Sequence, residues 1–192
     1  MMRRAVARAQ VEATEPALFE AVYREHFAMV WRVLRRFGVP PSDLPDAAQD
    51  VFVVVHRKLG EFDHRSRVST WLYAICLRVA SDRRRRAPNR YEAVGEEIDE
   101  ARVSGASTEP WELAERRALV QSALDAMSLE QRSVFALFEL EGMTGEEIAV
   151  LVEAPLATVH SRLRLGRETF RRVVGRARAR EEFDLARLGE KP

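Results

Sequence analysis

Helical periodicity is the feature that most constrains the fold of this sequence. Apolar residues recur at spacings of three and four along two long stretches, and neither stretch shows the strict alternation that is typical of β-strands. In the first stretch the pattern predicts helices over residues 16–37 and 45–59, and a third helix that begins after the N-cap Ser69. In the second stretch it predicts helices over residues 110–127, 129–140 and 145–152, and a last helix that begins at residue 155. The sequence therefore predicts an all-α fold.

A segment of different composition separates the two stretches. Residues 87–109 are rich in Gly, Ala, Ser and acidic residues, and they carry too little apolar surface to fold alone. We therefore expect two small helical domains, residues 1–86 and 110–175, joined by a flexible acidic linker. For the C-terminal tail, residues 176–192, two interpretations stay open: a frayed end, or a helix that presents Phe183, Leu185 and Leu188 to a partner.

Charge is unevenly distributed along the chain, although the formal net charge is only +1. Basic residues outnumber acidic ones by 16 to 10 in residues 1–86, whereas acidic residues outnumber basic ones by 8 to 4 in residues 87–118. Residues 156–180 hold eight Arg and one Glu. The two basic patches on either side of an acidic connector indicate a protein that contacts nucleic acid at two places.

Cysteine content and hydropathy exclude several other classes. A single cysteine, Cys76, cannot form a disulfide framework or a cysteine-based zinc site, and its apolar neighbours predict a core position. No stretch approaches the roughly 20 apolar residues of a membrane span, and the first residues lack the apolar run of a signal peptide. We therefore expect a soluble, cytoplasmic protein with no metal and no cofactor.

The second domain contains the pattern of a helix-turn-helix. Thr144 and Glu147 have the spacing of a capping box for a short helix, a turn over residues 153–155 follows, and a long basic helix comes next. An apolar anchor is predicted at Val159, Leu163, Gly166, Phe170 and Val173. The opposite face carries Ala157, His160, Ser161, Arg164, Glu168 and Arg171, flanked by Arg162 and Arg167. Because Arg can bind guanine bidentately, this face predicts DNA recognition; the alternative is an ordinary basic surface helix.

The helix after Ser69 combines aromatic and basic residues. Trp71 and Tyr73 are expected on its flanks, a polar loop over residues 61–68 precedes it, and four consecutive arginines, 83–86, follow. Exposed aromatic rings stack on unpaired bases at about 1–3 kcal/mol per base, while cations hold the backbone. The combination favours a site for unpaired DNA, against the alternative of a core tryptophan followed by a solvated charge run.

Five short motifs follow one another along the chain. They are Asp-Ala-Ala-Gln-Asp-Val-Phe at 46–52, Ser-Thr-Trp-Leu-Tyr-Ala-Ile at 69–75, Leu-Glu-Gln-Arg-Ser-Val-Phe at 129–135, Glu-Ile-Ala at 147–149 and Thr-Val-His-Ser-Arg-Leu at 158–163. Their order resembles the extracytoplasmic-function (ECF) sigma factors of bacterial RNA polymerase. The resemblance implies a non-enzymatic initiation factor with a sigma region 2-like bundle and a sigma region 4-like helix-turn-helix. Its implied partners are core RNA polymerase and promoter DNA, with an anti-sigma protein as a further candidate.

The resemblance also implies which residues bind each partner. Those that match the motif docking on the clamp helices of the polymerase are Asp46, Gln49 and Asp50. Those that match the segments capturing and opening the minus-ten element are Arg65, Ser66, Arg67, Thr70, Trp71, Tyr73, Arg78, Arg83 and Arg84. Those that match the reader of the minus-thirty-five element are Thr158, His160, Ser161, Arg164, Arg167 and Arg171. The acidic linker is implied to run toward the active-site and RNA-exit channels of the polymerase.

Two other functions stay open on the sequence alone. A stand-alone helix-turn-helix regulator would account for residues 128–175 but would leave the first domain without a role. A metal-dependent nuclease could use Asp43, Asp46, Asp50, His56 and His64, although one helix with loop histidines is a poor metal site. Polymerase-dependent DNA binding would exclude the regulator, and insensitivity to chelators would exclude the nuclease.

Overall fold

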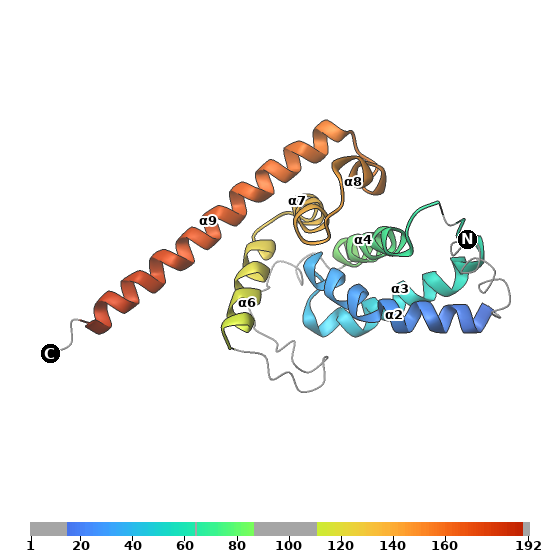
Figure 1. The fold of residues 1–192 in the computed structure, drawn as a ribbon, viewed down its shortest axis with the longest axis horizontal. Helices are drawn as coiled ribbons and strands as arrows, with labels where there is room; N and C mark the ends of the chain where they lie inside the picture. Colours follow the sequence, from blue (N-terminus) through green and yellow to red (C-terminus); the bar gives the residue numbers. More distant parts are fainter. Residues whose placement is uncertain (1–14, 64, 87–110, 190–192) are drawn as a thin grey trace, which may run out of the picture. The chain divides into compact units, whose positions relative to one another are not determined.

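All regular secondary structure in the part of the chain that the structure describes is helical. The structure, a computed structural model, describes residues 15–63, 65–86 and 111–189 (Figure 1). The predicted all-α fold is therefore confirmed. The expected acidic linker over residues 87–109 lies outside these described ranges. None of the described helices is long and apolar enough to cross a membrane.

The first of two compact units comprises residues 15–35 and 39–86 of the described chain. Its elements are α2 (Glu15–Arg36), η1 (Pro41–Asp43), α3 (Leu44–Lys58), η2 (Leu59–Glu61) and α4 (Val68–Arg86), of which η1 and η2 are single 3₁₀ turns. Fully buried side chains from the three α-helices form its core: Val30, Leu34, Val51, Val55, Leu72 and Cys76. The predicted bounds of the first two helices are confirmed to within one residue, as is the buried position of the cysteine.

Gly38 ends α2, as the sequence predicted. Its φ of +89° is a left-handed conformation that is strained for residues with a Cβ atom. The Val39 amide then donates to the Leu34 carbonyl oxygen at 3.0 Å, which satisfies one of the last carbonyls of the helix. Pro40 and Pro41 follow and cannot donate to a continuing helix.

The start of α4 differs from the prediction. The helix begins at Val68, and the Trp71 amide donates to the Arg67 carbonyl oxygen at 3.2 Å, so Ser69 lies inside the helix and is not its N-cap. The backbone carbonyl that accepts the first bond decides where a helix begins, and a suitable side chain nearby does not. At the other end, Arg83 to Arg86 form the last turn of α4, where positive side chains interact favourably with the helix dipole.

The second unit comprises residues 36–38 and, of the residues described after 86, residues 111–189. Its elements are α6 (Trp111–Asp125), α7 (Leu129–Phe135), the π-helical turn η4 (Ala136–Leu140), α8 (Gly145–Leu151) and α9 (Leu156–Gly189). Ser128 and Gln131 have the spacing of a capping box, and the structure forms one of its two bonds: the Ser128 hydroxyl oxygen accepts a hydrogen bond from the Gln131 amide at 3.3 Å and caps α7.

Helix α6 buries less of its length than predicted. Ala123 and Leu124 are fully buried near its C-terminal end, but Leu113 is 40% exposed and Leu119 and Val120 are half-buried. The apolar spacing of this helix predicts that Leu113 is buried together with Leu119, Val120 and Leu124, and for Leu113 this prediction is wrong. Apolar spacing shows which side of a helix is apolar, and the length of the packing partner decides how many turns of that side are covered.

The predicted helix-turn-helix is confirmed in α8 and α9. The Glu147 amide donates to Thr144 Oγ1 at 3.2 Å and Glu147 Oε2 accepts from the Thr144 amide at 2.9 Å, so both bonds of the capping box are present. The turn that follows places Glu153 at a φ of +51°. The Pro155 carbonyl oxygen accepts the first hydrogen bonds of α9, from the Thr158 and Val159 amides. Pro155 therefore lies one residue before the first turn of α9, whereas the sequence predicts it within that turn.

The expected apolar anchor fixes α9 on α7. Val159, Leu163 and Gly166 are buried, and the Phe170 ring stacks on Phe135 with centroids 5.3 Å apart and an interplanar angle of 25°. Gly166 favours this close approach, because a Cβ atom there would lie 3.2 Å from Phe135 Cβ, a tight contact that Phe135 would have to relieve by a small shift. The anchor residues of the prediction therefore share one face that packs on the unit's core.

Helix α9 continues well past the boundary expected at residue 175. It is helical to Gly189, so the interpretation of residues 176–189 as a helical extension is confirmed for the backbone. The side chains of Phe183, Leu185 and Leu188 lie outside the described part of the structure.

The substitution Gly166→Val tests the close approach of α9 to α7. We expect it to lower the free energy of unfolding of the second unit by about 1–3 kcal/mol, because the added methyl groups overpack the contact with Phe135. Urea unfolding followed by circular dichroism measures this. Gly175→Val is the matched control, since a Cβ atom at Gly175 meets nothing within 4 Å. Equal effects of the two substitutions would contradict the packing role of Gly166.

Candidate protein and nucleic-acid interfaces

Helix α3 has a buried face and an exposed polar face. Its core-facing residues Ala47, Ala48, Val51 and Val55 are buried. The three residues implied to bind polymerase, Asp46, Gln49 and Asp50, are all exposed, and Val53 continues their face at 41% exposure. The structure thus brings the predicted docking residues together on one side of α3, which we call the α3 docking face.

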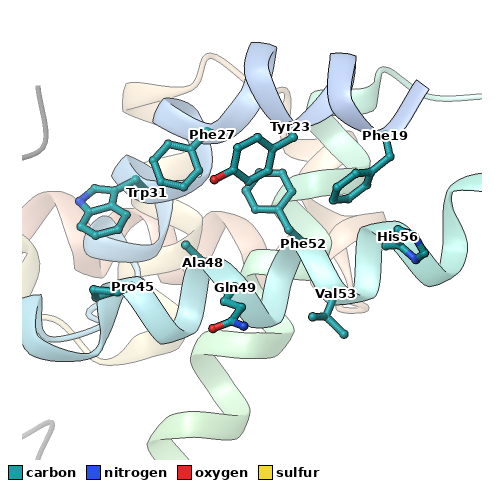
Figure 2. A pocket seen from close by; sticks show the side chains of 10 residues that line it. All are labelled: Phe19, Tyr23, Phe27, Trp31, Pro45, Ala48, Gln49, Phe52, Val53 and His56. Atoms are coloured by element: carbon teal, nitrogen blue, oxygen red, sulfur yellow. The ribbon is translucent and has the colours of Figure 1, made fainter. Parts of the chain in front are cut away.

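An aromatic groove between α2 and α3 borders this face (Figure 2). Phe19, Tyr23, Phe27 and Trp31 follow one another at every fourth position of α2, and Phe52 of α3 lies against them, 4.7 Å from Tyr23 between ring centroids. The groove has a volume of about 430 Å³. Its remaining lining residues come from α3: Pro45, Ala48, Gln49, Val53 and His56. Gln49 is therefore shared by the groove and the docking face.

The apolar spacing of α2 places Phe19, Tyr23 and Phe27 in one series with the core residues Val30 and Leu34, and it does not predict this groove. Tyr23 is 40% exposed, and Phe19 and Phe27 are only half-buried. The signal that could have revealed the groove is the run of four aromatic residues at intervals of four. Such a run places large rings on a single stripe of α2, offset from the fully buried stripe of Val30 and Leu34.

An ion pair joins the docking face to the end of α4. Asp50 Oδ2 accepts hydrogen bonds from Arg83 Nε at 3.0 Å and from Arg83 Nη2 at 2.6 Å. The Asp50 side chain is 52% exposed and that of Arg83 is 19% exposed. Two residues that the sequence placed in different interfaces, one for polymerase and one for DNA, are therefore direct partners in this structure.

Of the residues implied to contact the minus-ten element, four are exposed and four are half-buried. Arg65, Ser66, Arg67 and Arg78 are exposed, whereas Thr70, Trp71, Arg83 and Arg84 are half-buried. Trp71 also contacts Phe62 of the preceding loop, with ring centroids 5.0 Å apart. The loop thus carries two exposed cations, Arg65 and Arg67, and the first turn of α4 carries a partly covered tryptophan.

The structure contradicts the expected exposure of Tyr73. It was expected on an exposed flank of α4, but only 7% of it is exposed. The buried face of α4 is broad enough to include Tyr73 as well as Leu72, Ile75 and Cys76, so the ring belongs to the core and is not presented for stacking on a base.

On α9 the implied DNA-binding residues occupy the face opposite the anchor, with one exception. His160, Ser161, Arg164 and Arg171 are exposed, and Thr158 is half-buried near the helix start. Arg164 has an exposed partner on its own helix, Glu168, at 3.7 Å. The exception is Arg167, whose Nε donates to Glu139 Oε1 of η4 at 2.6 Å.

The metal site of the nuclease hypothesis is not assembled by the described residues. Among them, no group of three or more His, Cys, Asp and Glu side chains could hold a metal ion. His64, one of the candidate ligands, lies outside the described part of the chain.

Comparison with known families defines the class of protein. Sigma-70 region 2 matches residues 22–90, which cover α2 to α4, and sigma-70 region 4 matches residues 117–170, which cover the helix-turn-helix. A stand-alone regulator would leave the first unit without a role, whereas the match over residues 22–90 identifies this unit with sigma-70 region 2.

Relatives specify the family within this class. The ECF RNA polymerase sigma-E factor of Escherichia coli K12 is 32% identical over 139 residues, which are 68% of this chain and 73% of the relative. The ECF RNA polymerase sigma factor SigE of Mycolicibacterium smegmatis is 31% identical over 164 residues, which are 83% of this chain and 62% of the relative. The chain belongs to the ECF sigma factors of RNA polymerase, and it is an alternative sigma factor that directs transcription initiation.

Solved structures agree on the fold. CnrH, solved in complex with the cytosolic domain of CnrY, has a TM-score of 0.61 at 24% identity, over 90% of this chain and 96% of that chain. The sigma factor RpoE of Bartonella quintana, solved with the anti-sigma factor NepR, has a TM-score of 0.57 at 21% identity, over 80% of this chain and 96% of that chain.

The Asp50–Arg83 ion pair generates a testable prediction. In a double-mutant cycle with Asp50→Asn and Arg83→Gln, we expect a coupling of about 0.2–1 kcal/mol in the free energy of unfolding, as is usual for a partly exposed pair. Urea unfolding at low and high salt measures the coupling, which should fall at high salt. Strictly additive effects at low salt would show that the two side chains do not interact in solution.

Proposed function

We propose that the α3 docking face and the aromatic groove form the site at which this sigma factor binds core RNA polymerase. The single observation that supports this most strongly is the position of Gln49, which is exposed and lines both surfaces. Polar side chains beside a groove of aromatic rings provide the combination of buried anchors and specific hydrogen bonds that protein interfaces use. Asp46 and Gln49 supply the polar contacts, and Tyr23 and Phe52 line the apolar part.

Promoter contacts are divided between the two units. Cations of the loop and of α4, Arg65, Arg67, Arg78 and Arg84, hold the backbone of the minus-ten element, and Trp71 offers its uncovered surface to an unstacked base. Unstacking costs a few kcal/mol, which such contacts offset. Tyr73 is left out of this assignment because it is buried.

The minus-thirty-five element is assigned to the exposed face of α9. The buried anchor of Val159, Leu163 and Gly166 holds this helix, so that His160, Ser161, Arg164 and Arg171 face outward. A helix held in this way can enter the major groove of DNA with its polar face toward the bases. Binding alone accounts for the proposed role, and the chemistry of transcription belongs to the polymerase, so no enzymatic step is assigned to this chain.

An anti-sigma protein is included among the proposed partners. Both solved relatives carry such a chain or a cytosolic domain of a second protein in their complexes. A protein that covered the α3 docking face would compete directly with polymerase for Gln49 and the aromatic groove.

The docking proposal is tested by capture of purified core polymerase with the full chain. We expect Asp46→Ala combined with Gln49→Ala to weaken binding about tenfold or more, because central contacts dominate such interfaces. Asp50 is not substituted, since its change would also release Arg83. Arg57→Ala, an exposed change at the end of the same helix, is the control and should bind normally. Unweakened capture by the double variant would refute the proposed docking site.

The assignment of α9 is tested with the reconstituted holoenzyme. A promoter library randomised in the minus-thirty-five region reports the base preference of each variant. For Arg164→Ala we expect preference to relax at one or two positions, by about 1–3 kcal/mol if Arg164 contacts a base. Arg116→Ala on α6 is the matched control. An unchanged preference in Arg164→Ala would remove this residue from the recognition surface.

A further inference from the structure

We propose that Arg167 is a positioning residue that fixes the rotation of α9 about its own axis. This proposal rests on the proposed function of α9 as the DNA-recognition helix. It assigns Arg167 a role different from that of the exposed residues beside it. The sequence pattern grouped Arg167 with the DNA-binding residues, but its contacts are made within its own unit.

Two successive residues of η4 hold the Arg167 side chain. Its Nε donates to Glu139 Oε1 at 2.6 Å, and its guanidinium carbon lies 5.3 Å from the centroid of the Phe138 ring. The guanidinium therefore donates a hydrogen bond to a carboxylate and also lies over an aromatic ring, a combination that suits arginine better than lysine. Arg164, by comparison, has a partner at 3.7 Å on its own helix, which cannot fix that helix against another element.

The π-helical turn makes this arrangement geometrically available. In η4 the Glu141 amide donates to the Ala136 carbonyl oxygen at 3.1 Å, five residues back, so the turn contains one residue more than an α-helical turn. Ala136 and Leu137 are buried and anchor the turn in the core. The next two residues, Phe138 and Glu139, are then both presented to Arg167.

The contact lies beside the packing of α9 on α7. One residue before Arg167, Gly166 allows close approach to Phe135, and three residues after it Phe170 stacks on the same ring. The side-chain hydrogen bond between Arg167 and Glu139 adds a directional restraint on the rotation of α9 to these apolar contacts. A rotation of about 20° at a helix radius of roughly 5–6 Å would move side-chain tips by about 2 Å. That displacement is enough to break hydrogen bonds to base edges.

If Arg167 contacts DNA directly, the variants Arg167→Gln and Glu139→Gln should change DNA affinity in opposite directions. If Arg167 binds a phosphate, Arg167→Gln lowers affinity and reduces the salt dependence of binding by about one unit of slope, because one fewer counterion is released. Glu139→Gln would then free the arginine and raise affinity. If Arg167 positions α9, both variants lose the same contact and should have the same effect.

The experiment uses holoenzyme reconstituted with the full chain and the randomised minus-thirty-five library. We expect Glu139→Gln and Arg167→Gln each to reduce base discrimination by about three- to tenfold, with the double variant no worse than either and the salt slope unchanged. Arg167→Lys should recover only part of the discrimination, because a lysine can pair with Glu139 but lacks the planar face for Phe138. Glu115→Gln is the matched control, since it removes the same charge from an exposed position of α6, away from the proposed DNA-binding face.

Two results would overturn the proposal. The first is opposite changes of affinity in Glu139→Gln and Arg167→Gln with a reduced salt slope in the latter, which would make Arg167 a DNA contact. The second is full discrimination in both variants, which would make the contacts incidental. In either case Arg164→Ala still reports separately on the proposed function, because the ion pair of Arg164 is with Glu168 of its own helix. If Arg164→Ala and both Arg167-pair variants are all without effect, α9 is not the recognition helix.

Discussion

Both candidate interfaces depend on one constraint, the burial of a single face of an amphipathic helix. In α3 the burial of Ala47, Val51 and Val55 leaves Asp46 and Gln49 exposed, and in α9 the burial of Val159 and Leu163 leaves His160 and Arg164 exposed. Side chains of an α-helix lie at fixed angles, so fixing the apolar face also fixes the direction of the polar one. The proposed binding residues are therefore positioned by buried residues on the opposite face of the same helix.

Turns and caps then decide where these faces begin. The capping box of Thr144 and Glu147 starts α8, and the turn with Glu153 in a left-handed conformation redirects the chain into α9. Neither feature contacts DNA in the proposed function. The capping box supplies hydrogen bonds to the first turn of α8, and the left-handed conformation of Glu153 forms part of the tight turn between the two helices.

Ion pairs show that charged residues in a binding protein also have internal roles. Arg83 and Arg167 belong to arginine-rich segments, yet each is held by a carboxylate of another element, Asp50 or Glu139. A count of basic residues therefore overstates how many cations a partner can use. The partners lie 33 and 28 residues away in the chain, beyond the reach of any local pattern.

The sequence by itself determined which segments are helical, the capping box of α8, the apolar anchor of α9 and the polar side of α3, but not the start of α4 or the end of α9. These features depend on spacings of three and four residues, which are local properties of the chain. Only the tertiary structure decided that Tyr73 is buried, that Leu113 is exposed, and that the aromatic residues of α2 form a groove. The reason is physical: periodicity identifies the side of a helix that is apolar, but the size and shape of the packing partner determine how much of that side is covered.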